Sequence, residues 1–280
     1  MLIFDKATRM VTGQLPVKRI FHAFRPTAQF SAKKAVPVPT DISALPLWCP
    51  GTVDALPKLT ITFPPVGEFR IRRIISRSAP RPTTKYPSVK LNRSVHCESV
   101  LEAEVAELFD ACAGITSFGE QPAKLTYECA GVIHDHVPDF LVQAGNRRAF
   151  VEVKFASTIT AADLNRTRLL QRALQPLGYE YYLVTEVEIG RSHFQDNAKY
   201  LLRRARTPAS ESTRAHLYSR ARSSRLCLGD VVDTPELPDV ASMIVAGILS
   251  VSMSDRFGPA TIISVTPAQE GTPWAWELFQ

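Results

Sequence analysis

The chain has little of what marks a membrane or secreted protein. No apolar run approaches the ~18 residues that a membrane-spanning helix needs, and the N-terminal segment lacks the long apolar stretch of a signal peptide. Its five cysteines share no CxxC spacing, so we expect free thiols and neither disulfides nor a zinc site. We therefore expect a soluble, cytoplasmic protein without a membrane partner, and its 280 residues are enough for two domains.

Acidic residues are missing from one long basic stretch. Eight Lys or Arg and no acid lie between Arg70 and Arg93, and eight Lys or Arg with one acid lie between Lys199 and Arg225. Beyond Leu226 there are seven acids and one Arg. Basic stretches suit a polyanion such as DNA, although a charge run is more often a solvated face. From the first stretch we predict these DNA contacts: Arg70, Arg72, Arg73, Arg77, Arg81, Lys85, Lys90 and Arg93.

Prolines are concentrated at the N-terminal end, where 12 of 21 precede Ser88. We therefore expect a proline-rich extension over residues 1–69, with a short strand within Leu59–Phe63 and another over Phe69–Ser76. Residues 70–190 form the expected central domain, and residues 191–280 form the expected C-terminal domain.

A helix is predicted over Val95–Ala113, with Gly114 ending it. Glu98 and Glu102 are four positions apart and therefore lie on neighbouring turns of that helix. Either glutamate could turn towards a site, or both could be a solvated flank. The apolar stripe that supports the helix consists of Leu101, Val105, Leu108, Phe109 and Cys112.

The most informative stretch follows. Ile115–Val137 has the residue types of a strand, a turn and a strand. His136–Ala144 and Ala149–Phe155 are predicted strands joined by a tight turn that contains Gly145-Asn146. This apolar hairpin contains three charged residues, Asp139, Glu152 and Lys154. Charged side chains are rarely buried unless they are paired or bound to a metal, so the hairpin indicates a site.

The loop length determines how these charges face one another. A two-residue loop at Asn146-Arg147, or a four-residue loop, places Asp139 opposite Lys154 and Leu141 opposite Glu152, all on one face. Asp139 and Glu152 are then diagonal neighbours, ~7–8 Å apart at the backbone. A three-residue loop would break this arrangement.

Two carboxylates and a lysine at this spacing fit metal-assisted hydrolysis of a phosphodiester. The carboxylates can hold Mg²⁺, with Mn²⁺ as a substitute, and the lysine can stabilise charge in the transition state. The simpler alternative is a structural Asp139–Lys154 pair with Glu152 in solvent. His134 and His136 could face one side and bind a metal, but polar or DNA contacts are the more common role of such histidines.

The rest of the chain alternates between helices and one strand. We expect a helix over Ala161–Leu177 and a strand over Glu180–Glu188. The helices expected after that, with Ser210 as an N-cap, cover Phe194–Arg206, Ser212–Arg222 and the short segment Leu226–Val232.

An apolar helix over Pro238–Leu249 precedes a hairpin over residues 250–265. Helices followed by a hairpin resemble a winged helix. DNA-reading helices are usually basic, but this one carries only Asp239 as a charged residue. Docking of a protein partner is therefore at least as good an interpretation.

Four motifs together resemble a known family. They are NRSVHCESVLE at 92–102, FGEQP at 118–122, HVPDFLV at 136–142 and VEVK at 151–154. Their order and spacing are similar to those of PD-(D/E)xK nucleases and, more narrowly, of the TnsA family of transposon endonucleases, over roughly residues 70–265. The resemblance implies an α/β, restriction-endonuclease-like core with a mixed sheet flanked by helices, followed by a winged-helix-like domain.

The resemblance also implies roles for residues and partners. It selects Glu102 as the helix glutamate, with Asp139 and Glu152 as the other metal ligands and Lys154 as the catalytic lysine, and it leaves open whether Glu98 assists. TnsA-like proteins cut the 5′, non-transferred strand at transposon ends. They act with a DDE-type transposase subunit and an AAA+ regulator ATPase. The alternatives are a stand-alone restriction or repair nuclease and a non-catalytic DNA-binding scaffold.

Overall fold

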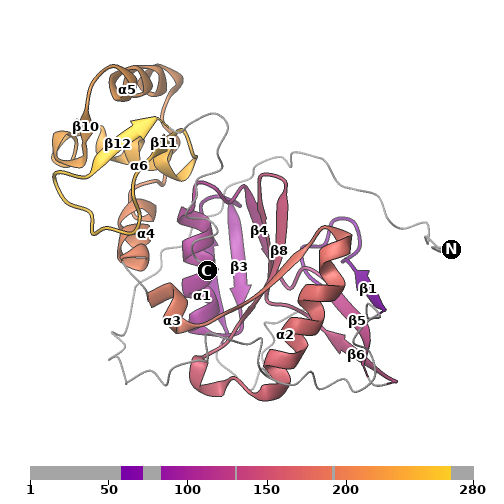
Figure 1. Cartoon of the computed structure of the whole chain (residues 1–280). Helices are drawn as coiled ribbons and strands as arrows, with labels where there is room; N and C mark the ends of the chain where they lie inside the picture. Colours follow the sequence, from indigo (N-terminus) through magenta and orange to yellow (C-terminus); the bar gives the residue numbers. More distant parts are fainter. Residues whose placement is uncertain (1–57, 72–82, 130, 191–192, 266–280) are drawn as a thin grey trace.

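The structure, a computed structural model, describes residues 58–71, 83–129, 131–190 and 193–265. Within these residues the chain has a mixed α/β fold with several sheets and helices (Figure 1). In the same residues no helix is long and apolar enough to cross a membrane. Most of the proline-rich extension lies outside the described residues. Residues 69–71 are not in a strand, and the rest of the strand expected over 69–76 also lies outside.

A four-stranded mixed sheet is the centre of the fold, as expected. Its order is β4 (Ser117–Glu120), β7 (Phe140–Ala144), β8 (Arg147–Val153) and β9 (Glu180–Val184). The first three strands are antiparallel, and β9 runs parallel to β8. The chain crosses from β8 to β9 through α2 (Ala161–Leu174), because parallel neighbours need a long connection.

The two faces of this sheet are covered by different helices. On one face α1 (Val100–Ala111) packs through Phe109, whose ring meets that of Phe140 edge-on at 5.5 Å. On the other face Leu170 and Leu174 of α2 pack with the buried side chains of β8 and β9. Because successive strand residues point to opposite faces, the two helices enclose the hairpin from both sides.

α1 begins later than the sequence pattern predicted. Residues Arg93–Cys97 form β3, which pairs with β2 (Thr84–Ser88), so the prediction of a helix from Val95 is wrong. Ser99 is the N-cap: its backbone is extended and its side chain accepts a hydrogen bond from the Glu102 N–H. Ser-x-x-Glu is a helix-start signal. The predicted apolar stripe is buried, and Cys112 is the C-cap.

A second sheet flanks the first and has the order β1-β5-β6. β5 (Lys124–Cys129) and β6 (Val132–His136) belong to the predicted strand-turn-strand region, which contains three strands when β4 is included. β1 (Leu59–Thr62) confirms the strand expected within Leu59–Phe63, and it pairs with β5. This end of the predicted extension is therefore part of the folded core.

The cysteine prediction is only partly confirmed. Cys97, Cys112 and Cys227 are free thiols. Cys129 is disulfide-bonded, so the expectation of free thiols is wrong there.

Helices and a small sheet form the C-terminal part. β9 ends at Val184 and α3 (Glu186–Gly190) follows, so the prediction of a strand that continues to Glu188 is wrong. The Glu188 carboxylate accepts the Thr185 N–H at 2.8 Å at the start of this helix. The remaining elements are α4 (Phe194–Leu202), α5 (Glu211–Ser223), β10 (Leu226–Cys227), the 3₁₀ turn Leu228–Asp230, α6 (Leu237–Val245), β11 (Leu249–Ser250) and β12 (Ile262–Val265). β10 and the 3₁₀ turn lie where a short helix over Leu226–Val232 was predicted, so that prediction is wrong.

Two details of the C-terminal predictions are confirmed. Ser210 caps α5 by accepting the Thr213 N–H. β11 and β12 form the expected antiparallel pair, and β12 lies between β10 and β11.

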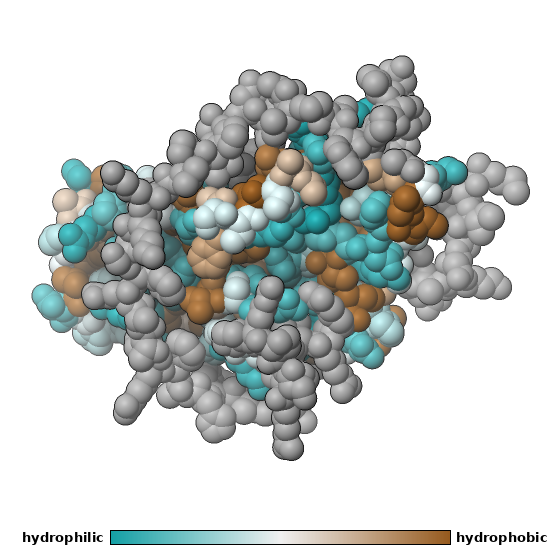
Figure 2. Space-filling view, turned by 90° about the horizontal axis from the view of Figure 1, so that it is seen from below, coloured by the Kyte–Doolittle hydropathy of each residue, from teal (hydrophilic) through white to brown (hydrophobic). Residues whose placement is uncertain are grey.

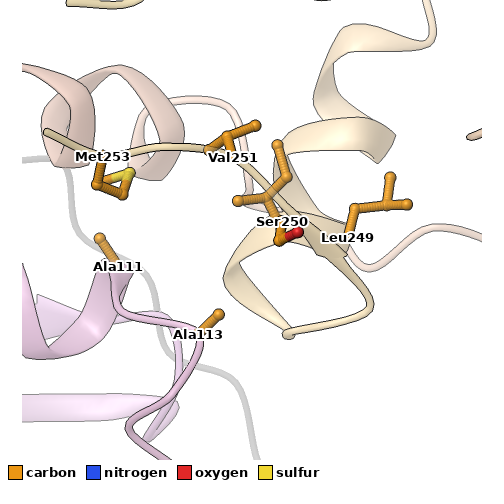
Figure 3. A pocket seen from close by; sticks show the side chains of 7 residues that line it. Ala111, Ala113, Leu249, Ser250, Val251 and Met253 are labelled. Atoms are coloured by element: carbon orange, nitrogen blue, oxygen red, sulfur yellow. The ribbon is translucent and has the colours of Figure 1, made fainter. Parts of the chain in front are cut away.

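The apolar core continues from α1 into this C-terminal part. One cluster of buried side chains includes Val105 of α1, Ala198 of α4 and Ile244 of α6. A small apolar pocket lies at this contact (Figure 3), lined by Ala111, Ala113, Ile244, Leu249, Ser250, Val251 and Met253. The core therefore runs across the boundary predicted at residue 190, and the division into domains stays a prediction.

The exposed apolar side chains are scattered. Figure 2 shows brown residues in several separate patches among teal ones, with grey residues over much of that face. Val66 and Ile133 are the most exposed large apolar residues among those described, at 87% and 73%. Scattered single apolar residues are normal on a protein surface, so they do not mark a site.

Candidate active site

The register of the β7–β8 hairpin differs from the predicted one by two residues. Ala144 pairs with Arg147 and Leu141 with Phe150, so the loop is Gly145-Asn146. Gly145 has a φ of +57°, which suits glycine at the first position of a two-residue hairpin loop. Continuing the register one step places Asp139 level with Glu152, and the prediction that it lies opposite Lys154 is wrong. A shift of two leaves each side chain on its predicted face.

Glu102 lies at the start of α1 and is 7% exposed. Its carboxylate accepts the Glu98 N–H at 2.6 Å and the Ser99 hydroxyl at 2.9 Å. Glu98 precedes the helix, so the idea that the two glutamates stack on neighbouring turns is wrong. The cap fixes the Glu102 side chain at the N-terminal end of α1.

The electrostatics indicate that the carboxylates are near one another. Burial, followed by the negative charges of Glu152 and Glu102, raises the pKa of Asp139 well above its usual range. Burial also raises the pKa of Glu102 to about 7, and the charges of Glu98 and Glu152 act in the same direction. We name Glu98, Glu102, Asp139 and Glu152 the acidic cluster.

The acidic cluster is not gathered into a metal-ligand set. Among the described residues there is no group of three or more His, Cys, Asp or Glu side chains placed to hold a metal ion. The donor chemistry nevertheless fits Mg²⁺, which prefers carboxylate oxygens. The carboxylates of Glu102 and Glu152 have protein partners and would have to exchange them for an ion.

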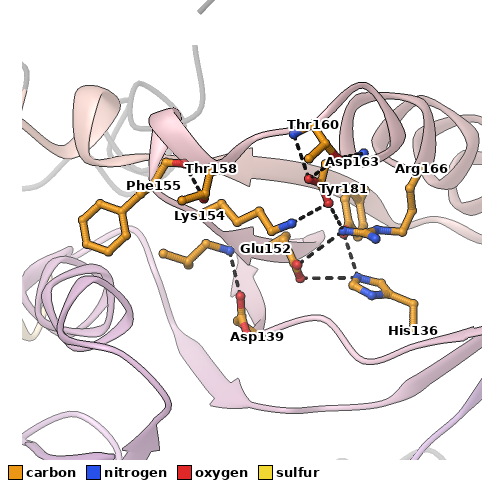
Figure 4. A network of polar contacts seen from close by, with 11 residues as sticks. His136, Asp139, Glu152, Lys154, Phe155, Thr158, Thr160, Asp163, Arg166 and Tyr181 are labelled. Carbon is orange, nitrogen blue, oxygen red and sulfur yellow. Dashed lines mark hydrogen bonds and ion pairs between the residues drawn. The ribbon is translucent and has the colours of Figure 1, made fainter. Parts of the chain in front are cut away.

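Glu152 and Lys154 belong to a polar network between β8 and α2 (Figure 4). Glu152 is 9% exposed, and its oxygens lie 3.4 Å from His136 Nε2 and 3.6 Å from Arg166 Nη2. Lys154 Nζ lies 2.5 Å from Asp163 Oδ1. The simpler alternative, a pair of Asp139 with Lys154 and a solvated Glu152, is therefore wrong.

Sequence reasoning missed the α2 members of this network. Asp163 is in a capping box with Thr160, and the Thr160-x-x-Asp163 spacing is a signal that could have been recognised. Burial acts in the opposite direction, but hydrogen bonds from Lys154 and Thr160 hold the pKa of Asp163 below its usual range. Arg166 lies 2.8 Å from Asp163 and bridges it to Glu152. No local pattern predicted Arg166, because its partner lies on another element.

The two histidines have the polar role that was considered more common. His136 Nε2 and the Tyr181 hydroxyl are 2.9 Å apart. His134 is exposed and stacks on Tyr127, with ring centroids 5.4 Å apart.

Four of the eight predicted DNA-contacting residues lie within the described residues, and three of these four contact other parts of the protein. Arg70 and Arg93 lie 3.5 and 2.8 Å from the carboxylate of Glu120, which is 1% exposed. Lys90 donates to the carbonyl of Cys112 at 2.6 Å, at the C-terminal end of α1, and burial lowers the pKa of Lys90 to about 8. Lys85 is exposed. The other four, Arg72, Arg73, Arg77 and Arg81, lie outside the described residues.

Comparison with known proteins adds no family assignment. A scan against protein-family models finds no match for this chain, and a search of curated proteins finds no matching relative.

Proposed function

We propose that this chain is a Mg²⁺-dependent DNA endonuclease that cuts the 5′, non-transferred strand at transposon ends, as one subunit of a heteromeric cut-and-paste transposase. The observation that carries the proposal is the acidic cluster. Asp139, the residue before β7, is level with Glu152 of β8, and the charge of Glu102 acts on both of them. Crowded carboxylates with perturbed pKa values are typical of functional sites.

The topology supports the finer fold assignment. A mixed sheet whose antiparallel hairpin carries the acidic residues, with α1 and α2 on opposite faces, is the arrangement expected of a restriction-endonuclease-like core. The order α5, β10, α6, β11, β12, with β12 in the middle of its sheet, supports a winged-helix-like domain. Val240, Ala241 and Ile244 of α6 are buried in the core of this chain, so these apolar side chains are available neither for reading DNA nor for docking a partner.

The chemistry is divided among residues of α1, the β7–β8 hairpin and α2. Glu102, Asp139 and Glu152 would hold Mg²⁺, which when bound supplies charge neutralisation at the phosphate and a more acidic water. Lys154 would stabilise the charge that develops on the phosphate. Asp163 orients the Lys154 ammonium in the structure, and Arg166 lies beside Glu152 as a second cation near the same position.

The proposed partners are DNA, a DDE-type transposase subunit and an AAA+ regulator ATPase. The test reconstitutes the chain with these two proteins on transposon-end DNA in Mg²⁺ and measures 5′-strand cutting. Asp139→Ala and Lys154→Ala should each lower the rate ~10²–10³-fold, because each removes stabilisation of the transition-state charge.

A matched pair of control residues lies close by in the sequence. Asp135 and Lys124 form an exposed ion pair at 3.2 Å on β6 and β5. Asp135→Ala and Lys124→Ala should leave cutting within about twofold of the unmodified protein, since exposed pairs contribute little. Full 5′ cutting by the Asp139 and Lys154 variants would contradict the site assignment.

A non-catalytic DNA-binding scaffold is the second candidate. It is favoured by the protein partners that Glu152 and Lys154 already have. A scaffold predicts no carboxylate-dependent Mn²⁺ binding in calorimetry, whereas the endonuclease predicts binding that Asp139→Ala abolishes. Cutting by the purified chain alone would instead favour a stand-alone nuclease.

A further inference from the structure

Gln121 combines burial with a backbone conformation that is unusual for its residue type. Its φ is +46°, and its exposed fraction is 1%. Among the described residues, Asn92 is the other non-glycine with positive φ. The left-handed region costs a side-chain-bearing residue ~1–2 kcal/mol. Pro122 follows, and a residue before proline normally prefers extended backbone. The surroundings must therefore stabilise this conformation.

The contacts of Gln121 join three segments around the acidic cluster. Its backbone N–H donates to the Asp139 carbonyl at 2.8 Å. Its carbonyl accepts the Ile71 N–H at 2.9 Å. Its side-chain Nε2 donates to Glu98 Oε1 at 3.2 Å. A residue with extended backbone would direct its N–H and its side chain differently, so the left-handed turn is what lets Gln121 make these contacts together.

The same contacts continue to the glutamate of α1. Glu98, held by the Gln121 amide, donates its own N–H to Glu102 Oε2 at 2.6 Å. A hydrogen-bonded chain thus runs from Gln121 through Glu98 to Glu102, while the backbone of Gln121 holds the residue that carries the Asp139 carboxylate. These hydrogen bonds connect the end of β4, the residue before β7 and the start of α1.

We propose that Gln121 is a positioning residue that sets the spacing of the acidic cluster through its amide on Glu98 and its N–H on Asp139. The inference rests on the proposed function, because it assigns Gln121 to the geometry of the same cation site. Gln121 itself touches neither the cation nor the phosphate in this proposal. Residues that orient metal ligands in this way commonly affect metal affinity or activity ~10–100-fold when they are replaced.

The test uses Gln121→Gly. Glycine adopts positive φ without steric cost, so this variant should fold and keep both backbone hydrogen bonds while losing the amide contact to Glu98. We expect at least a tenfold loss of Mn²⁺ affinity in calorimetry and a similar loss of 5′ cutting in the reconstituted complex. Loss of the buried side chain and relief of the backbone strain act on stability in opposite directions, so its melting temperature should stay close to that of the unmodified protein.

Two further variants make the test specific. Asn92→Gly relieves the same backbone conformation at an exposed turn, φ +51°, between β2 and β3, and should leave Mn²⁺ affinity and cutting unchanged. Glu98→Ala should reproduce the loss seen with Gln121→Gly, and the double variant should be no worse than either single one, because both remove the same contact.

The outcomes are distinguishable. Lower Mn²⁺ affinity in Gln121→Gly at a nearly unchanged melting temperature supports the inference. If the variant keeps its Mn²⁺ affinity and its cutting activity, the inference is overturned and the proposed function is unaffected. The same conclusion holds for a variant that is less stable but binds Mn²⁺ normally. An unmodified protein that neither binds Mn²⁺ nor cuts DNA in the complex overturns both.

Discussion

The carboxylates at the two ends of α1 have opposite electrostatic surroundings. At the C-terminal end Asp110 is fully buried and accepts four hydrogen bonds. The donors are the hydroxyls of Tyr86 at 2.9 Å and Ser88 at 2.7 Å, and the N–H groups of Val89 at 2.7 Å and Lys90 at 2.8 Å. This carboxylate joins the turn after β2 to the helix, and its charge is satisfied.

At the N-terminal end the carboxylates of the acidic cluster lie near enough to one another to raise the pKa values of Asp139 and Glu102. Among the described residues the Asp139 side chain accepts one hydrogen bond, from the Val153 N–H at 2.8 Å, and its charged neighbours are acidic. The contrast separates a carboxylate that stabilises the fold from a group of carboxylates that costs stability. Such a cost is common where function needs the arrangement.

Replacing Asp110 should have the largest effect on stability. Asp110→Ala leaves two hydroxyls and two backbone N–H groups without their acceptor, so the free energy of unfolding should fall by ~3–5 kcal/mol. Urea unfolding followed by circular dichroism measures this. Asp135→Ala, at the exposed pair on β6, is the control and should leave the urea midpoint nearly unchanged, because exposed ion pairs contribute little. Equal losses of unfolding free energy in the two variants would contradict the structural role of Asp110.

The pH dependence of stability should show the raised pKa of Glu102. Its pKa is raised in the folded state from 4.5 to about 7, by burial first and then by Glu98 and Glu152. The folded protein therefore binds this proton more tightly than the unfolded chain does. The corresponding stability is present below pH 4.5 and is lost as the pH rises through about 7. Subtracting the unfolding free energy of Glu102→Gln from that of the unmodified protein should give a difference that falls over this window, and a flat difference would contradict the assignment.

Replacing Asp139 should have a smaller effect of the opposite sign to that of Asp110. Asp139→Asn removes one negative charge from the acidic cluster and keeps an acceptor for the Val153 N–H. Without divalent cations, the free energy of unfolding at pH 7.5 should rise by ~1 kcal/mol, the usual size of such a gain. The same urea titration measures it. A loss of stability would mean that the Asp139 charge is as well satisfied as that of Asp110.

The sequence predicted local features of this contrast well. The apolar residues of His136–Ala144 and Ala149–Phe155, with Gly145-Asn146 as the turn, located the hairpin, and a register error of two residues left the predicted faces unchanged. The start of α1 was predicted too early because the prediction used the apolar stripe and overlooked Ser99 as the N-cap.

The long-range contacts could not be predicted from local patterns. Arg166 and Asp163 reach the hairpin only because α2 crosses over to place β9 beside β8. The left-handed backbone of Gln121 is enforced by contacts to segments distant in sequence, and its residue type gives no hint of it. The four hydrogen bonds to Asp110 likewise depend on how the β2–β3 turn packs on α1.

The most direct test of the contrast is thermal unfolding with increasing MnCl₂ at constant ionic strength. A cation that binds only the folded state raises the melting temperature by mass action. We predict that the melting temperature of the unmodified protein rises progressively with Mn²⁺ in the millimolar range, while that of Asp139→Asn starts higher and stays constant. No rise in the unmodified protein, or the same rise in both proteins, would contradict the claim that the acidic cluster is a cation site.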